Sequence, residues 1–255
     1  RTGGGSYKLF SKLLGSFATL SIGPRDIAII QEGPAERRKF LDALGCQFST
    51  GYMQDLKNFN QILKQRNALY KSGTAIQDDL WEGLSRTLVQ FGGELTLRRL
   101  HLIKNIQDEV LKTYEQISSG AEELNLHYHT SFGLDFSSRD LGSALDLNSL
   151  KHQIIDSYWT KLVNRRKREQ DLKTTLYGPH KDDLVFDLKG KSLREFGSQG
   201  QQRSTALSLK LAAAVELEKQ FQAPPILLLD DIFSELDKKR RQALSERIIR
   251  CQQVF

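Results

Sequence analysis

The chain has 255 residues, of which 39% are hydrophobic and 27% are charged, and its formal net charge is +6. This length allows one large domain or two modest ones, and the composition is that of a globular protein rather than a disordered one. No apolar run approaches the roughly 20 residues of a membrane span and no signal-peptide pattern opens the chain, so we expect a cytoplasmic protein without membrane contact, whose positive charge permits nucleic acid as a partner.

The first regular element that the sequence predicts is a strand. Ala18, Leu20 and Ile22 alternate with polar residues, which is typical of a half-buried strand. Gly23-Pro24 ends this pattern. The stretch GPRDIAIIQEGPAERRKFLD, which begins there, predicts a loop that leads into a helix, because Pro34 suits the first turn of a helix.

Three helical patterns follow, each with apolar residues at steps of three to four. They cover residues 52–63, 80–114 and 150–162, and the first contains the stretch LKQRNAL. Gly92-Gly93 interrupts the second pattern, so we expect a break or kink there.

Between the second and third helical patterns, residues 126–132 alternate like a strand. His127 and His129 form an H-x-H sequence on this strand, which does not predict a metal site without cysteines or carboxylates nearby. Cys46 and Cys251 are far apart in sequence and predict neither a disulfide framework nor a zinc site.

A basic run ends the third helical pattern, and it has two interpretations. One is the solvated face of a helix, and the other is a contact with the phosphate backbone of DNA. The candidate DNA-binding residues are Arg165, Arg166, Lys167 and Arg168.

Strand pattern returns after this run. Leu184, Phe186 and Leu188 alternate with polar residues, and Lys189-Gly190-Lys191 predicts a hairpin turn. The preceding GPHKDD (residues 178–183) by itself predicts a turn with exposed charges, whereas its place shortly before SQGQQR favours a role at a site.

The stretch from residue 196 to residue 237 begins with a helix start. Ser198 and Gln201 stand at the spacing of a capping box, and Gly200 lets another backbone or a phosphate approach closely. The N–H groups of such a helix start favour anions. Residues 206–217 are apolar on nearly every side, which predicts a buried helix, and Pro224-Pro225 prevents it from continuing.

A strand and two carboxylates complete this stretch. Residues 226–229 (ILLL) lack alternation, which predicts a parallel strand covered on both faces. Asp230 and Asp231 follow where the strand emerges, where carboxylates can hold Mg²⁺ and orient a water molecule. Ser234 can cap the next helix.

SQGQQR and ILLLDDIFSELD together closely resemble the RecF family, bacterial recombination-mediator ATPases related to ABC and SMC ATPases. GPRDIAIIQEGPAERRKFLD, LKQRNAL and GPHKDD resemble the same family. The resemblance implies an α/β fold, an ABC-type ATPase domain that is discontinuous in sequence (residues 1–32 and 173–255). A mainly helical arm (residues 33–172) would be inserted into it.

The resemblance also implies roles for individual residues. Asp230 would be the Walker B aspartate that holds Mg²⁺, and Asp231 would be the catalytic carboxylate beside the attacking water. Asp237 would belong to the D-loop. The residues of the signature motif, which would bind ATP, are Ser198, Gln199, Gly200 and Gln201.

The function implied by the resemblance is an ATP-induced homodimer with weak ATPase activity. It would bind double-stranded DNA at single-strand gaps and promote the loading of RecA together with RecR and RecO. The alternatives are another SMC-like or OLD-type ATPase, or a DNA-binding scaffold without catalytic activity.

The sequence departs from the family in one respect. It contains no G-x-x-x-x-G-K-[ST], the Walker A pattern that cradles the β- and γ-phosphates. Because the chain opens at Arg1 and stops within a strand pattern at Phe255, we expect it to be part of a longer protein, with the Walker A loop upstream. The chain alone is therefore expected to bind ATP poorly.

Overall fold

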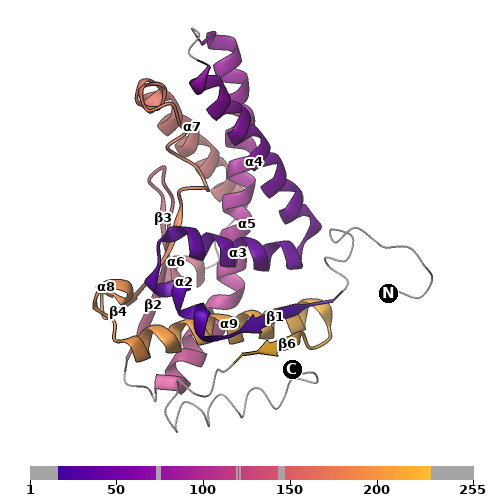
Figure 1. The fold of residues 1–255 in the computed structure, drawn as a ribbon, viewed down its shortest axis with the longest axis vertical. Helices are drawn as coiled ribbons and strands as arrows, with labels where there is room; N and C mark the ends of the chain where they lie inside the picture. The colour runs from indigo at the N-terminus through magenta and orange to yellow at the C-terminus, as the bar shows by residue number, and fades with distance from the viewer. Residues whose placement is uncertain (1–16, 73–75, 119, 121, 143–146, 231–255) are drawn as a thin grey trace, which may run out of the picture.

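The computed structural model describes residues 17–72, 76–118, 120, 122–142 and 147–230 (Figure 1). The elements of its first half are β1 (Thr19–Ile22), η1 (Pro24–Ile27), α2 (Ala28–Gln31), α3 (Pro34–Phe48), α4 (Thr50–Lys71) and α5 (Asp78–Ser118). Those of its second half are β2 (Leu124–His129), β3 (Asp135–Ser137), α6 (Ser138–Gly142), α7 (Leu147–Asp171), β4 (Asp183–Leu188), β5 (Lys191–Ser192), α8 (Leu193–Phe196), α9 (Gln199–Phe221) and β6 (Ile226–Leu229).

A parallel pair of strands joins the two ends of the described chain. Strand β1 pairs with β6 in the register Thr19↔Ile226 to Ile22↔Leu229. The predicted alternation of β1 is confirmed, since Leu20 and Ile22 are buried and Ser21 is exposed. The prediction that β6 is covered on both faces is wrong for Leu228, which is 48% exposed. Successive strand side chains point to opposite faces, and in the described part of the chain only one of these faces is packed.

The second sheet is antiparallel, with the strand order β3-β2-β4-β5. Its β4–β5 connection is the predicted hairpin turn, in which Lys189 and Gly190 have φ angles of 52° and 76°. Positive φ at both central residues is the geometry of a two-residue hairpin loop. Strand β2 lies in the range predicted for the arm, and it pairs with β4 along its whole length. The predicted domain boundaries therefore stay a prediction.

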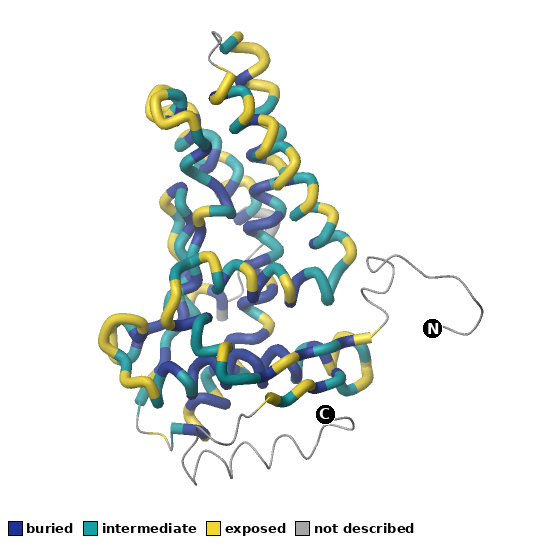
Figure 2. The backbone as a smooth tube through the Cα atoms, viewed as in Figure 1, coloured by how far each residue is buried: buried dark blue, intermediate teal, exposed yellow. Residues whose placement is uncertain are grey.

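The helices form an elongated arm above the β1–β6 pair. Helix α5 runs through the molecule and packs against α4 and α7 in the upper part of Figure 1 and against α9 in the lower part. Figure 2 shows that burial is most continuous in α9, whereas the upper part of α4 is mostly exposed or half-buried. None of the helices within the described ranges combines the length and the apolar character that a bilayer crossing requires.

The expected break at Gly92-Gly93 is wrong, because α5 continues through both glycines. The glycines instead let other elements approach the helix. A Cβ on Gly92 would lie 2.7 Å from Cε1 of Tyr158 and 3.1 Å from Cε2 of Phe59. A Cβ on Gly93 would lie 3.0 Å from Cγ1 of Ile155. The pair therefore serves the packing of α7 against α5.

Candidate functional site

The first residue of α9 is preceded by a complete cap. Ser198 Oγ accepts a hydrogen bond from the Gln201 N–H (3.3 Å), and Gln201 Oε1 accepts one from the Ser198 N–H (2.6 Å). The predicted capping box is therefore confirmed. Ser198 and Gln199 are exposed. Because the first N–H groups of a helix have no intrahelical acceptor, this exposed end offers donors and a positive dipole to an anion.

The start of α9 is held in place by contacts with three other parts of the chain. Gln201 Nε2 donates to Glu122 Oε1 (2.5 Å), just before β2. The buried Gln202 accepts from Gln31 Nε2 (2.8 Å) and donates to the main-chain oxygen of Leu193 (3.0 Å). These contacts fix the direction in which the helix start faces, so its donors are oriented before any ligand binds.

Asp230 lies at the carboxyl end of the parallel pair. It is exposed, and its N–H donates to the Ile22 carbonyl (2.9 Å), which extends the pairing of β6 with β1. A Cβ on Gly23 would lie 3.3 Å from the Asp230 Cβ, so Gly23 leaves room for this aspartate. A carboxylate at the end of a parallel strand has the place and chemistry of a Mg²⁺ ligand. Asp231 and Asp237 lie outside the described residues.

Ser198 and Asp230 are not brought together within one chain. The β1 end of the molecule meets the middle of α9, where Lys210 Nζ contacts the Ser21 carbonyl (2.9 Å) and Asp26 Oδ1 (2.8 Å). Lys210 lies about 18 Å along the helix axis from Ser198, at the usual rise of a helix. One chain therefore presents two separate surfaces suited to a nucleotide.

Comparison with known proteins shows which proteins the chain resembles. No protein-family model matches the chain. It is 37% identical over 253 residues to the DNA replication and repair protein RecF of Lachnoclostridium phytofermentans, and the matched region covers 97% of this chain and 63% of the relative. It is 36% identical over 248 residues to RecF of Bacillus subtilis, and the matched region covers 96% of this chain and 64% of the relative.

Solved structures show the same likeness. The recombination mediator protein RecF-ATP in the RecFOR pathway matches with a TM-score of 0.85 and 30% identity, over 99% of this chain and 65% of that one. The RecF-ATPrS structure matches with a TM-score of 0.83 and 30% identity, over 98% of this chain and 64% of that one. Over nearly its whole length the chain is similar in sequence and fold to RecF proteins. It spans a little less than two thirds of the length of these relatives, and the predicted α/β fold, ABC-type with a helical arm, is confirmed.

Several RecF-like motifs lie in the interior rather than on a surface. In RRKFLD, Arg37 makes a two-pronged contact with Asp183 of GPHKDD (2.6 and 3.0 Å). Asp42 of the same motif is held by the buried Arg99, at 2.9 and 3.0 Å from its two oxygens. GPHKDD does form a turn, but Asp182 is fully buried, and burial raises the pKa of its carboxyl group.

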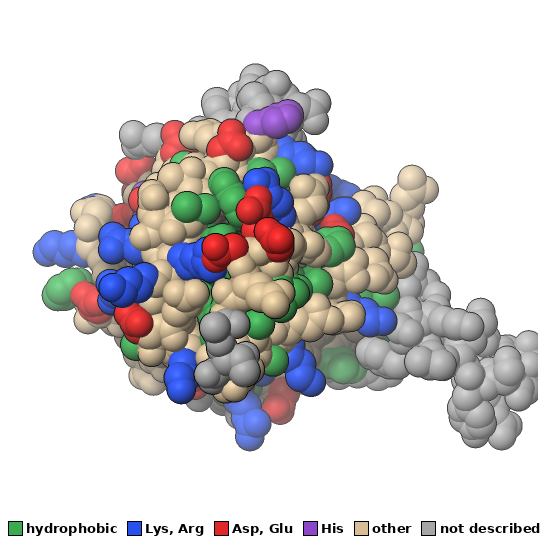
Figure 3. Space-filling model, turned by 90° about the horizontal axis from the view of Figure 1, so that it is seen from above, with side chains coloured by type: hydrophobic (Ala, Val, Ile, Leu, Met, Phe, Trp, Pro, Cys, Tyr) green, Lys and Arg blue, Asp and Glu red, His purple; other side chains and the backbone are tan. Residues whose placement is uncertain are grey.

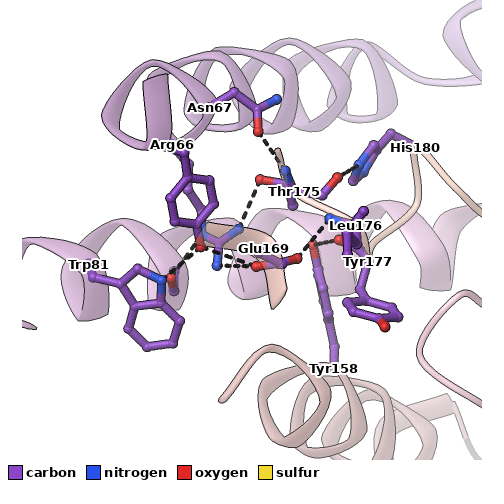
Figure 4. A network of polar contacts seen from close by, with 11 residues as sticks. Arg66, Asn67, Trp81, Tyr158, Glu169, Thr175, Leu176, Tyr177 and His180 are labelled. Atoms are coloured by element: carbon purple, nitrogen blue, oxygen red, sulfur yellow. Dashed lines mark hydrogen bonds and ion pairs between the residues drawn. The ribbon is translucent and has the colours of Figure 1, made fainter. Parts of the chain in front are cut away.

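A second interior network contains Arg66 and Asn67 of LKQRNAL (Figure 4). Arg66 and Glu169 form an ion pair at 2.7 Å in which both side chains are fully buried. Arg66 also donates to Thr175 Oγ1 (2.8 Å), and Asn67 accepts from the Thr175 N–H (2.8 Å). Glu169 accepts in addition from the Leu176 N–H (2.7 Å). This network joins α4 and the end of α7 to the segment that returns toward β4.

The basic run lies on the last turns of α7. Arg166 Nη2 contacts Asp78 Oδ1 (2.5 Å), and its guanidinium lies 4.4 Å from the Trp81 ring centroid. Arg165, Lys167 and Arg168 are exposed. Seen along the arm, basic and acidic side chains are interspersed over this end of the molecule (Figure 3). Arg166 therefore stabilises the arm, and the other three remain candidates for a contact with DNA.

Sequence reasoning missed the buried charges Arg66, Arg99 and Lys210. A usable signal was present for Arg99, which stands four residues after Leu95 and four before Ile103. A cation on the apolar face of a helix indicates a buried cation with partners. The partners themselves could not be read from the sequence, because Asp42 and Glu169 are distant along the chain.

Proposed function

We propose that the chain is part of an ATP-gated DNA-binding protein of the RecF type, in which two protomers meet head to tail around two ATP molecules. The observation that carries this proposal is the separation of the exposed helix start at Ser198 from Asp230. A nucleotide that needs both groups can have them only from two chains. The fixed orientation of the α9 start supports this, since Ser198 and Gln199 at its end are exposed.

The described residues fit the groups that this proposal needs. Asp230 is an exposed carboxylate at a strand end, which suits Mg²⁺, and the capped start of α9 suits a phosphate. ATP with Mg²⁺, when bound, would supply the γ-phosphate that is hydrolysed. Ser198, Gln199, Gly200 and Gln201 would hold that phosphate across the dimer, Asp231 would orient the attacking water, and Asp237 would face the partner.

The cellular role that we propose is the one implied by the RecF relatives. The closed dimer would hold duplex DNA beside a single-strand gap, and slow hydrolysis would release it. RecO and RecR would be its partners, RecA loading its outcome, and the cytoplasm its location. The description of a related structure within the RecFOR pathway supports these partners.

Ser198 provides the test, in a version of the protein that includes a Walker A segment. Ser198→Arg should fold and bind ATP as a monomer, because the change lies on the face offered to the second protomer. It should fail to dimerise with ATP, and hydrolysis and ATP-dependent DNA binding should fall together. Sedimentation with and without ATP, beside a nucleotide titration, measures both.

Ser198→Ala is the matched control. Loss of a serine cap should cost about 1 kcal/mol of stability while leaving the interface open. Normal ATP-dependent dimerisation of Ser198→Arg would reduce Ser198 to a helix cap and remove the basis of the proposal.

A further inference from the structure

A cleft of about 530 Å³ lies at the base of the arm, where α4 rises from α3 (Figure 1). It is lined by residues of α3, α4 and α5 and by the turn that contains GPHKDD. Its polar and charged lining consists of Arg38, Lys39, Asp42, Asn60, Arg99 and His180. Three of these side chains are cations and one is an anion, so positive charge predominates in the lining.

The positive charge of Arg38 is not balanced by the nearby carboxylates. Its Nη1 donates to the main-chain oxygen of Asp182 (2.7 Å) rather than to a carboxylate. The Asp183 carboxylate is engaged by Arg37, and the Asp42 carboxylate is engaged by Arg99. Burial, and then the charge of Arg99, lower the pKa of Arg38. An arginine stays charged at neutral pH, so the cleft attracts anions.

His180 also lines this cleft. Its Nε2 donates to the main-chain oxygen of Thr175 at 3.1 Å (Figure 4). The ring is kept in place by Phe59, with ring centroids 5.8 Å apart. Because Nε2 is the donor, the neutral ring has an acceptor at its buried Nδ1, which cannot donate to an anion. Arg38 therefore supplies the charged donor of the cleft.

Exposed lysines continue the positive charge beyond the cleft. Lys57 and Lys64 of α4 are exposed and stand three residues before and four residues after Asn60, so all three share one face of the helix. Lys181 is exposed in the turn on the other side. Two exposed lysines on one helix face and a third in the turn suit a ligand with successive phosphates better than a single nucleotide.

We propose that this cleft binds a backbone phosphate of nucleic acid, with Arg38 as its principal contact. The row of Lys57, Asn60 and Lys64 then meets the neighbouring phosphates. The inference rests on the DNA binding proposed above and adds a surface at the base of the arm, apart from the basic run of α7. It assigns to RRKFLD and GPHKDD a ligand as well as an interior role.

The first experiment measures duplex DNA binding by fluorescence anisotropy between 50 and 200 mM salt, in the version that includes a Walker A segment, with ATP present. Arg38→Ala should weaken binding about tenfold at low salt, as expected for loss of a hydrogen bond to a charged group. The salt dependence should become shallower by roughly 0.9 in logarithmic slope for each phosphate that is no longer neutralised. Arg38→Gln keeps a donor for the Asp182 carbonyl, so it should fold normally and still lose the same DNA affinity. This variant therefore distinguishes a loss of binding from a loss of folding.

A control variant makes the comparison specific. Lys219→Ala removes one exposed cation at the far end of α9, where Lys219 pairs with Glu216, and should leave affinity and slope unchanged. A general effect of net charge would instead lower binding equally in Arg38→Ala and Lys219→Ala.

The second experiment follows the His180 ring by NMR in this chain. Duplex DNA should shift its signals, whereas inorganic phosphate at the same total phosphate concentration should not. Shifts with inorganic phosphate and none with DNA would overturn the assignment to nucleic acid. If both Arg38 variants keep the wild-type DNA affinity and salt slope, the inference about this cleft is wrong. The proposed function would stand in that case, since the protein would still bind DNA. A wild-type protein that binds no DNA would overturn the proposed function as well.

Discussion

The start of α9 and the interior of the arm use polar residues in opposite ways. At the start of α9, Ser198 and Gln199 are exposed, and the capping box holds the end of the helix open to the surface. In the arm, Arg66 and Glu169 are fully buried, and their polar atoms contact other residues of the same chain. Both regions carry RecF-like motifs. The RecF-like motifs therefore contain two kinds of residues, those that hold the arm together and those that are exposed at the start of α9.

The sharpest way to break this comparison is to remove Arg66. Arg66→Ala leaves Glu169 as an uncompensated buried charge, which should lower the free energy of unfolding by about 3–5 kcal/mol. Arg86→Ala is the matched control on the same arm, where Arg86 pairs with Glu82 at the surface, and should cost less than about 1 kcal/mol. Urea denaturation of both variants measures the difference, and equal losses of stability would show that the buried pair has no special part in it.

The second prediction concerns the pH dependence of stability, which should report on the buried His180. Burial lowers the pKa of His180 to about 4, below the value near 6.5 expected for the unfolded chain. A lowered folded-state pKa means that the stabilisation is present above about pH 6.5 and is lost as the pH falls toward 4. The loss should reach roughly 3 kcal/mol.

His180→Gln isolates this contribution, because other buried groups titrate in both proteins. The pKa of Asp182 is raised, so its effect on stability has the opposite sign. Thermal unfolding of wild type and variant should be measured from pH 4 to 7. The difference in stability between the two proteins should change as the pH falls from about 6.5 to 4. A constant difference would mean that His180 has the same pKa in the folded and unfolded protein.

The glycines of α5 give the smallest expected effect. Gly92→Ala places a Cβ against Tyr158 and should cost about 1–3 kcal/mol as overpacking. Gly83 lies in the same helix with no atom within 4 Å of such a Cβ, so Gly83→Ala should stabilise by up to about 1 kcal/mol. Chemical denaturation measures both changes in stability. A loss in Gly92→Ala with a gain in Gly83→Ala would confirm that Gly92 serves packing, and a gain in both variants would contradict it.

Periodicity predicted most of the local structure because local structure depends on neighbouring residues. The alternation at Ala18–Ile22, the helix start at Ser198 and the turn at Lys189-Gly190 were all readable for this reason. The meaning of Gly92-Gly93 was not, since whether a glycine breaks a helix or admits a neighbour depends on Tyr158, which arrives from another helix.

The candidate site could be predicted only in outline. The helix start and the strand before Asp230 were expected, but their separation depends on how β1 and Lys210 meet α9. Taken alone, GPHKDD predicted a turn with exposed charges, whereas its place before SQGQQR favoured a role at a site, and neither interpretation included the burial of Asp182. It is buried because Tyr128 and the Ser131 N–H bind it at 3.1 and 2.8 Å, and neither interaction leaves a local pattern.

The pairing of β1 with β6 also constrains how the chain folds. Residue 19 meets residue 226, so this sheet cannot form until α9 and the strand after it have been synthesised. The arm, by contrast, is built largely from helices adjacent in sequence, whose contacts close short loops at little entropic cost. We therefore expect the arm to acquire structure first on the ribosome, and the β1 edge to wait as an unpaired strand that a chaperone or a second copy can reach.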